Sequence, residues 1–127
     1  MGFESVPTVA VLYVGDLSRV RRFYEGAFGW SGVDEGPRWC GLRSRAGVVT
    51  LVETAEARVQ IDPASRRSAT AIKLVIDVDN IADTIRAVVD FGGRADPSDR
   101  AWTFRGQLHR DVIDPEGNVL QLVQRAA

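Results

Sequence analysis

The stretch PTVAVLYVGDLSRVRRFYEGAFGW, residues 7–30, changes its pattern at Asp16. Before Asp16 it is apolar and rich in β-branched residues, a composition typical of a strand that is covered on both faces. After Asp16, which can cap a helix, apolar side chains recur at helical spacing as far as Gly29, a residue type that commonly ends helices. The stretch therefore predicts a buried strand followed directly by an amphipathic helix.

The second half of the chain repeats this order. The apolar run AIKLVIDV, residues 71–78, predicts another strand, and Asn80 can cap the helix that follows. Apolar residues predicted to share one side of this helix, Ile81, Ile85, Val88 and Val89, then lead to a glycine pair at 92–93. Sliding one half over the other superposes the two cap residues, and Gly29 falls on Gly93. The chain is therefore predicted to contain two copies of one structural unit.

Each predicted helix is followed by strand-like segments with tight turns between them. Pro115 with Gly117 predicts a hairpin near the C-terminus, because proline presets one turn torsion and glycine permits a positive φ. A half of this size cannot bury its own sheet well, so we expect the two halves to pair. The strand-like segments are RWCGLRS and VVTLVE in the first half, and AWTFR, QLHRDVI and VLQLVQ in the second.

These patterns predict an α+β fold made of two tandem βαβββ modules. Module 1 covers about residues 6–54, a connector with weaker periodicity covers about 55–69, and module 2 covers about 70–125. We expect them to form a single domain over residues 1–127, because a chain of this length suits one domain.

The charge balance excludes several classes of partner. With 16 basic and 17 acidic residues the formal net charge is −1, which provides no attraction to nucleic acid or to an anionic membrane. No apolar run approaches the roughly 20 residues that span a bilayer, and the N-terminal residues lack the pattern of a signal peptide.

Because one cysteine, Cys40, cannot form an internal disulfide, we expect a reducing, cytoplasmic location.

The chain has one histidine, His109, and one cysteine, Cys40. These counts exclude a His-rich zinc site, a Cys-based zinc site and a two-His iron site within one chain. A nucleophilic pair of Cys40 with His109 stays open, although neither residue has the local sequence setting of a nucleophile.

Two segments resemble one known superfamily. Residues 11–30, VLYVGDLSRVRRFYEGAFGW, look like the opening strand and helix of the vicinal oxygen chelate superfamily. Residues 111–124, DVIDPEGNVLQLVQ, resemble its closing DP-x-GN hairpin and last strand. That superfamily includes glyoxalases, extradiol dioxygenases, epimerases, fosfomycin-resistance enzymes and bleomycin-resistance proteins. The resemblance implies a curved mixed sheet shaped as a cup, with both helices on its convex side, and it implies a homodimer.

In metal-dependent members of the superfamily, each of four strands lining the cup carries one ligand, typically His, Glu, His and Glu. Matching the motifs residue by residue places those positions at Val9, Thr50, Lys73 and Gln121. A misalignment in one strand would put Glu53 in place of Thr50. Val9 cannot coordinate, a protonated Lys73 repels cations, and Gln121 is a single weak donor. The resemblance therefore implies a site with no metal and no cofactor.

Alternation along the strands predicts which side chains line the cup. Valines dominate this surface and Lys73 adds a charge, a composition typical of a small-molecule pocket. The aromatic residues Trp39 and Trp102 border the cup, where they can stack on a flat ligand or bury against neighbouring strands or a dimer partner. The ligand-binding candidates are Val9, Val11, Tyr13, Trp39, Thr50, Lys73, Val75, Trp102, Val119 and Gln121.

Lys73 is the only lysine in the chain, and it lies in a stretch predicted to be a buried strand. It either pairs with Asp77, Glu53 or another carboxylate and organises the sheet, or it contacts an anionic or carbonyl group of a ligand or acts as a base. A third possibility is that it reaches out past the sheet edge. His109, in the strand before DPEGN, is interpreted as a surface residue, with a pocket acid or base as the alternative.

The first prediction for function is a metal-independent small-molecule-binding protein. It resembles the bleomycin-resistance branch of the superfamily, which holds antibiotics noncovalently in grooves between two subunits. The ligand is expected to be partly apolar or aromatic and to be oriented by Lys73 and Gln121. The alternative is a metal-free lyase or isomerase acting on a carbonyl compound, in which Lys73 or His109 transfers the proton. A third hypothesis is a duplicated fold used only for protein–protein contact.

Overall fold

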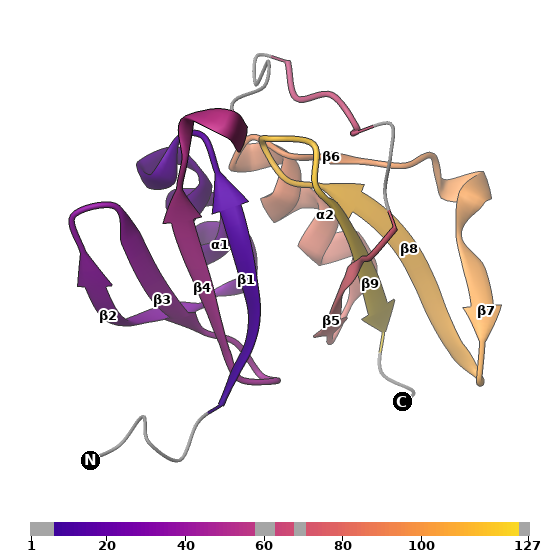
Figure 1. Ribbon diagram of the computed structural model, residues 1–127. Helices are drawn as coiled ribbons and strands as arrows, with labels where there is room; N and C mark the ends of the chain where they lie inside the picture. The colour runs from indigo at the N-terminus through magenta and orange to yellow at the C-terminus, as the bar shows by residue number, and fades with distance from the viewer. Residues whose placement is uncertain (1–6, 58–62, 68–70, 125–127) are drawn as a thin grey trace. The chain divides into compact units, whose positions relative to one another are not determined.

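The computed structural model describes residues 7–57, 63–67 and 71–124, and the chain divides into two compact units, residues 1–59 and residues 60–127. Each unit has a mixed β-sheet and one α-helix (Figure 1), which confirms the predicted α+β class. Within each unit a strand and a helix precede the remaining strands, so the predicted tandem order is also confirmed.

The elements of the first unit are β1 (Thr8–Val14), α1 (Leu17–Phe28), β2 (Ser31–Gly36), β3 (Trp39–Arg43), β4 (Val48–Glu53) and the 3-10 helix η2 (Ala55–Ala57). Those of the second unit are β5 (Leu74–Val78), α2 (Ile81–Asp90), β6 (Arg94–Ala95), the 3-10 helix η3 (Ser98–Arg100), β7 (Trp102–Phe104), β8 (Gln107–Ile113) and β9 (Val119–Gln124). No helix in these described segments is long and apolar enough to cross a membrane.

The first unit has the strand order β1-β4-β3-β2, with β1 parallel to β4 and the other neighbours antiparallel. Helix α1 begins and ends where the sequence predicts. The Asp16 carboxylate accepts a hydrogen bond from the Arg19 backbone N–H at 3.2 Å, and Gly29 adopts a left-handed φ of 70°. Tyr24 of α1 stacks on Trp30 with ring centroids 4.8 Å apart, and both side chains are buried in the core of this unit.

Strand β2 is an element that the sequence pattern does not predict. Its residues, SGVDEG, lack the run of β-branched and aromatic side chains that favours a strand. Pairing with β3 supports it, and so does Arg21 of α1, which forms ion pairs with Glu35 at 2.8 Å and Glu25 at 3.1 Å. Hydrogen bonds to two carboxylates raise the pKa of the Arg21 guanidinium, and the bond to Glu35 has a larger effect than the bond to Glu25. A contact from the helix therefore compensates for weak local strand propensity.

The second unit has the strand order β5-β9-β8-β6, with β7 pairing to β8; β5 is parallel to β9 and the other pairs are antiparallel. Asn80 caps α2 as predicted, because its side chain accepts a hydrogen bond from the Asp83 backbone N–H at 2.9 Å. Ile81 and Val88 of α2 are buried. The prediction that Val89 shares their side is wrong, since it lies about 100° round the helix from Val88 and is 55% exposed.

Two turns set the hairpins of the second unit. Arg105 and Gly106 join β7 to β8 with φ values of 55° and 74°, the sign pattern of a type I′ turn. The predicted DPEGN turn joins β8 to β9, and the Asp114 carboxylate in it accepts hydrogen bonds from the backbone N–H groups of Glu116 and Asn118 at 2.9 and 3.0 Å. The short strand β6 escapes the sequence pattern because two residues are too few to show alternation.

Candidate ligand-binding site

One face of the sheet in the second unit carries a row of polar side chains. Strand register places Val75 beside Gln121 and Gln121 beside Asp111, so these three side chains project from the same side of β5, β9 and β8. His109 lies two residues before Asp111 on β8 and therefore shares that side. On the opposite face of β9, Leu120 and Leu122 are apolar and buried.

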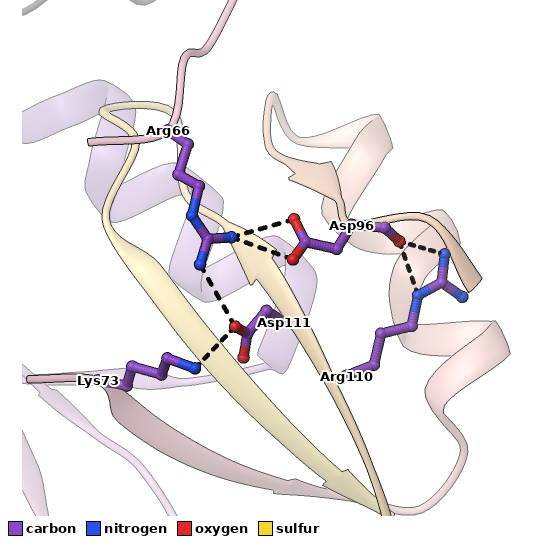
Figure 2. A network of polar contacts seen from close by, with 5 residues as sticks. All are labelled: Arg66, Lys73, Asp96, Arg110 and Asp111. Atoms are coloured by element: carbon purple, nitrogen blue, oxygen red, sulfur yellow. Dashed lines mark hydrogen bonds and ion pairs between the residues drawn. The ribbon is translucent and has the colours of Figure 1, made fainter. Parts of the chain in front are cut away.

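Asp111 is the centre of an ion-pair network (Figure 2). Its Oδ2 accepts a hydrogen bond from Lys73 Nζ at 2.8 Å and lies 3.5 Å from Arg66 Nη2. Arg66 Nη1 also donates to both carboxylate oxygens of Asp96, each at 3.1 Å. The Arg110 guanidinium donates to the backbone carbonyl oxygen of Asp96 at 2.9 and 2.6 Å. Three cations therefore meet two aspartates, which leaves the network with an excess positive charge.

The two partners of the Lys73–Asp111 pair differ in burial. The Asp111 side chain is 7% exposed, whereas the Lys73 side chain is 34% exposed. Asp111 Oδ1 is buried and has no hydrogen-bond partner among the residues that the structure describes. Lys73 Nζ also lies 5.4 Å from the ring centre of Trp102, within range of a cation–π contact. Because an ammonium group has three donors, Lys73 can bind a further acceptor while it holds Asp111.

His109 is buried, and both of its ring nitrogens contact the protein. Nδ1 lies 3.0 Å from Gln121 Nε2, and Nε2 lies 3.2 Å from the backbone carbonyl oxygen of Phe104. Trp102 stacks on the imidazole with ring centroids 5.3 Å apart and 14° between the planes. The interpretation of His109 as a surface residue is therefore wrong, because the register of β7 on β8 places Trp102 over it and leaves it 4% exposed.

The candidates in the first unit lie on one face of its own sheet. The register places Thr50 of β4 beside Val11 of β1. It places both Tyr13 and Trp39 beside Val52 of β4. Val11 and Tyr13 are 52% and 59% exposed. Val9 is also exposed, at a point where the β1–β4 register shifts by a residue, as in a β-bulge. This face therefore presents mainly apolar surface.

The second unit brings several predicted site residues together, and they surround the Asp111 network. Val119, a further candidate, packs instead with Ala64 and Ile113 in a buried apolar cluster. The predicted residues on the polar face of this unit are Lys73, Val75, Trp102, His109 and Gln121.

The prediction that Lys73 lies inside a strand is wrong. Lys73 lies directly before β5 rather than inside a strand, because pairing of β5 with β9 begins only at Leu74. Its carboxylate partner is Asp111, and not Asp77 or Glu53. Glu53 accepts a hydrogen bond from the Leu17 backbone N–H at 3.0 Å and so supports the start of α1. The prediction that Lys73 pairs with a carboxylate is confirmed, although its partner lies 38 residues away in the sequence.

Sequence reasoning missed the residues that organise this network. Asp111 had a usable signal, since an acidic residue stands at an alternate position of a buried strand, two residues after His109. Arg66 has no such signal in the sequence, because it belongs to the segment 55–69, whose weak periodicity predicts only a connector. The structure shows that Arg66 contributes a guanidinium to Asp111 and Asp96.

The side chains present do not fit a divalent metal ion at the positions that the superfamily resemblance implies. One position holds Lys73, whose ammonium is already paired with Asp111, and another holds Val9, which has no donor atom. At Gln121 the amide nitrogen faces His109, which leaves a single neutral oxygen. No group of three or more His, Cys, Asp or Glu side chains within residues 7–57, 63–67 and 71–124 is placed to hold a metal ion.

Comparison with known families agrees with the fold. A family model described as a glyoxalase-like domain matches residues 9–123. The chain belongs to this glyoxalase-like family. The resemblance to the vicinal oxygen chelate superfamily that residues 11–30 and 111–124 carry is thereby confirmed.

Solved structures similar to this glyoxalase-like protein cover nearly its whole length, although no curated protein matches it. A glyoxalase/bleomycin resistance protein/dioxygenase family enzyme from Burkholderia phytofirmans is 20% identical, with a TM-score of 0.71 over 90% of this chain and 94% of that one. A glyoxalase-related enzyme from Fulvimarina pelagi is 23% identical, with a TM-score of 0.67 over 94% and 89%. A fosfomycin resistance protein from Listeria monocytogenes, complexed with Mn(II), is 12% identical, with a TM-score of 0.70 over 96% and 91%. At these identities the likeness shows the fold alone.

Proposed function

We propose that this glyoxalase-like protein is a metal-independent small-molecule-binding protein whose ligand lies on the polar face of the second unit's sheet. The observation that carries the proposal is the Lys73–Asp111 ion pair, which stands at one of the positions where metal-dependent superfamily members place a ligand. An ammonium held 2.8 Å from a buried carboxylate is a fixed organic cation, and a divalent ion beside it would be repelled.

The contacts available on this face define the ligand. Lys73 offers its remaining N–H donors to a carbonyl, carboxylate or phosphonate oxygen, and the excess positive charge of the network favours an anionic group. Val75, on the same face, is 55% exposed, and covering the exposed half of a valine is worth roughly 1 kcal/mol. The ligand is therefore partly apolar or aromatic and carries an oxygen acceptor.

Binding has better support than catalysis by the two candidate acid–base residues. A lysine that acts as a base must have a lone pair directed at the substrate, and Lys73 Nζ already donates to the Asp111 carboxylate at 2.8 Å. Both nitrogens of His109 already face protein groups, so neither is available to a substrate in this arrangement. The metal-free lyase or isomerase thus remains the alternative with less support.

The proposal extends to the setting in which the protein works. Two similar structures are named as resistance proteins, a fosfomycin resistance protein and a glyoxalase/bleomycin resistance protein from Albidiferax ferrireducens. These names support an antibiotic as the ligand, and its sequestration is part of the present proposal. A single domain with its two modules forming a cup, and a homodimer, are what the superfamily resemblance implies. The free, buried thiol of Cys40 suits a reducing cytoplasm.

Native mass spectrometry of protein purified from a cell extract tests the proposal. We expect a dimer that carries an organic small molecule and no metal ion. The Lys73→Met variant should lose the small molecule, whereas Arg86→Met, which breaks an exposed ion pair with Asp83, should retain it. Circular dichroism establishes that both variants fold. Retention of the molecule by Lys73→Met, or its conversion to a product by the wild-type protein, would contradict the proposal.

A further inference from the structure

The single histidine of the chain, His109, is held at both of its ring nitrogens. His109 Nε2 lies 3.2 Å from the backbone carbonyl oxygen of Phe104, and Nδ1 lies 3.0 Å from the side-chain nitrogen of Gln121. The imidazole is buried under Trp102, which stacks on it. Its two hydrogen-bonding directions are therefore fixed by the packing of β7 and β9 against β8.

These two contacts determine the tautomer of His109. A backbone carbonyl oxygen can only accept, so the hydrogen of a neutral imidazole must lie on Nε2 and point to Phe104. Nδ1 is then a bare acceptor, and Gln121 must turn its amide NH₂ group toward it. The carbonyl oxygen Oε1 of Gln121 is the part of the amide left for other partners. Gln121 lies beside Val75 and Asp111 in the strand register, on the face assigned to the ligand.

We propose that His109 is a positioning residue that makes Gln121 present its oxygen, so that the site selects a ligand with an N–H or O–H donor at this point. This inference rests on the proposed function, since it uses the same face of the sheet. Lys73 supplies the complementary donor at the other end of the row. The ligand class that satisfies both is a molecule with a donor and an oxygen acceptor near each other, such as a carboxamide or a hydroxy acid, attached to an apolar or aromatic body.

Protonation of His109 reverses the hydrogen-bonding group that Gln121 presents to the ligand. An imidazolium carries hydrogen on both nitrogens, so Nδ1–H meets the Gln121 NH₂ group and the amide must rotate to place Oε1 there. Gln121 then presents NH₂ to the ligand in place of oxygen. Acidification therefore weakens binding of a donor ligand at this position without removing any residue from the site.

The charged groups around His109 are few in the part of the chain that the structure describes. Asp111 lies on its own strand and is paired with Lys73, which also contacts Trp102. Asp77 of β5 lies on the same face as His109 but two strands away, since both residues pair with Val123 of β9. Arg105 lies over the Phe104 ring, 4.9 Å from its centre. Gln121 is still the direct partner of Nδ1. Asp111 is compensated by Lys73, Asp77 lies two strands away, and the Arg105 guanidinium is exposed.

Nitrogen NMR of uniformly ¹⁵N-labelled protein tests the tautomer without any ligand. Because the chain has one histidine, the two-bond ¹H–¹⁵N spectrum shows one imidazole that needs no assignment. At pH 8 we expect the Nε2–H tautomer, and on acidification the Gln121 side-chain NH₂ signals should shift with the same midpoint as the imidazole. An Nδ1–H tautomer at pH 8, or NH₂ signals that ignore the imidazole titration, would overturn the inference.

A pair of variants separates the direct contact from general electrostatics. Gln121→Glu supplies only acceptor oxygens to Nδ1, so the His109 midpoint should rise by at least one pH unit, a tenfold change in proton affinity. Gln107→Glu places the same charge on β8, on the same face and two residues from His109. We expect this control to raise the midpoint by less than half as much. Equal shifts in both variants would overturn the inference.

Three small probes test the ligand class. Benzamide has both donor and acceptor, N,N-dimethylbenzamide has lost the donor, and benzoate has only acceptors. At pH 8 we expect benzamide to perturb the Gln121 and His109 signals at least fivefold more strongly than the dimethyl compound. Equal perturbation overturns the selectivity for donors. If none of the three perturbs these signals, the ligand assignment and the proposed function both fail, whereas a wrong tautomer removes only this inference.

Discussion

Replacement of Lys73 by methionine tests the ion pair on which the proposed site depends. Methionine keeps most of the side-chain volume and removes the ammonium, so the Asp111 carboxylate loses its hydrogen bond at 2.8 Å. Asp111 remains 7% exposed, and its other oxygen has no partner among the described residues. Of the charged partners in the described segments, the variant therefore leaves this buried carboxylate with the Arg66 guanidinium alone, 3.5 Å away.

The expected cost lies between two limits. An exposed ion pair contributes up to about 1 kcal/mol, whereas removal of one partner from a fully buried pair costs about 3–5 kcal/mol. Lys73 is 34% exposed and Arg66 remains near Asp111, so we expect Lys73→Met to lower the free energy of unfolding by about 2 kcal/mol. Arg86→Met, which removes an ion pair whose side chains are 80% and 71% exposed, should cost less than about 0.5 kcal/mol.

Urea denaturation followed by far-ultraviolet circular dichroism measures both variants. In an Asp111→Asn background the same Lys73→Met change should cost less than about 1 kcal/mol, because a neutral amide no longer needs the ammonium. If Lys73→Met costs no more than Arg86→Met, the buried ion pair does not exist as described. If its cost is unchanged in the Asp111→Asn background, Lys73 acts through packing rather than charge.

Three further outcomes follow from the structure. Gly117→Ala should destabilise the protein by about 2 kcal/mol or more in urea denaturation, because φ is 82° there and the added methyl group would collide with the Ser65 carbonyl oxygen; a neutral effect would exclude that contact. Asn80→Ala removes the cap that accepts from the Asp83 N–H and should cost about 1 kcal/mol, and a loss below 0.3 kcal/mol would argue against this cap. Burial raises the pKa of the Cys40 thiol above its ordinary value of 9.0. As the pH rises past about 9, the Cys40 thiol therefore ionises in the unfolded chain before it does so in the folded protein, and the wild-type protein loses stability. The cost of Cys40→Ala, measured as the free energy of unfolding, should then be smaller at pH 10 than at pH 7. An equal cost at both pH values would contradict the raised pKa.

Local pattern was enough to predict the helices and most strands. Asp16 and Gly29 delimit α1 in the structure as they do in the sequence, because caps and helix stops are short-range features. Strand β2 was not predictable in this way, since its support comes from Arg21 on α1 and from pairing with β3. Gly36 in β2 also lies where any side chain would collide with the Trp39 indole, a demand that appears only after the strands are paired.

The site shows the same limit more clearly. Alternation correctly assigned Gln121 and Val75 to one face, because that property depends only on strand period. The partner of Lys73 depends on which strands are neighbours and in what register, so a local pattern could not select Asp111 over Asp77. The burial of His109 likewise follows from the β7–β8 hairpin that places Trp102 over it.

The most direct test of the central claim is a metal titration of the wild-type protein. After dialysis against a chelator, isothermal titration calorimetry with Mn²⁺, Ni²⁺ and Zn²⁺ should show no saturable binding near one ion per chain, since the Lys73 ammonium already neutralises Asp111. The thermal midpoint should also be the same with and without these ions. Stoichiometric binding of any of the three that also raises the thermal midpoint would contradict the account.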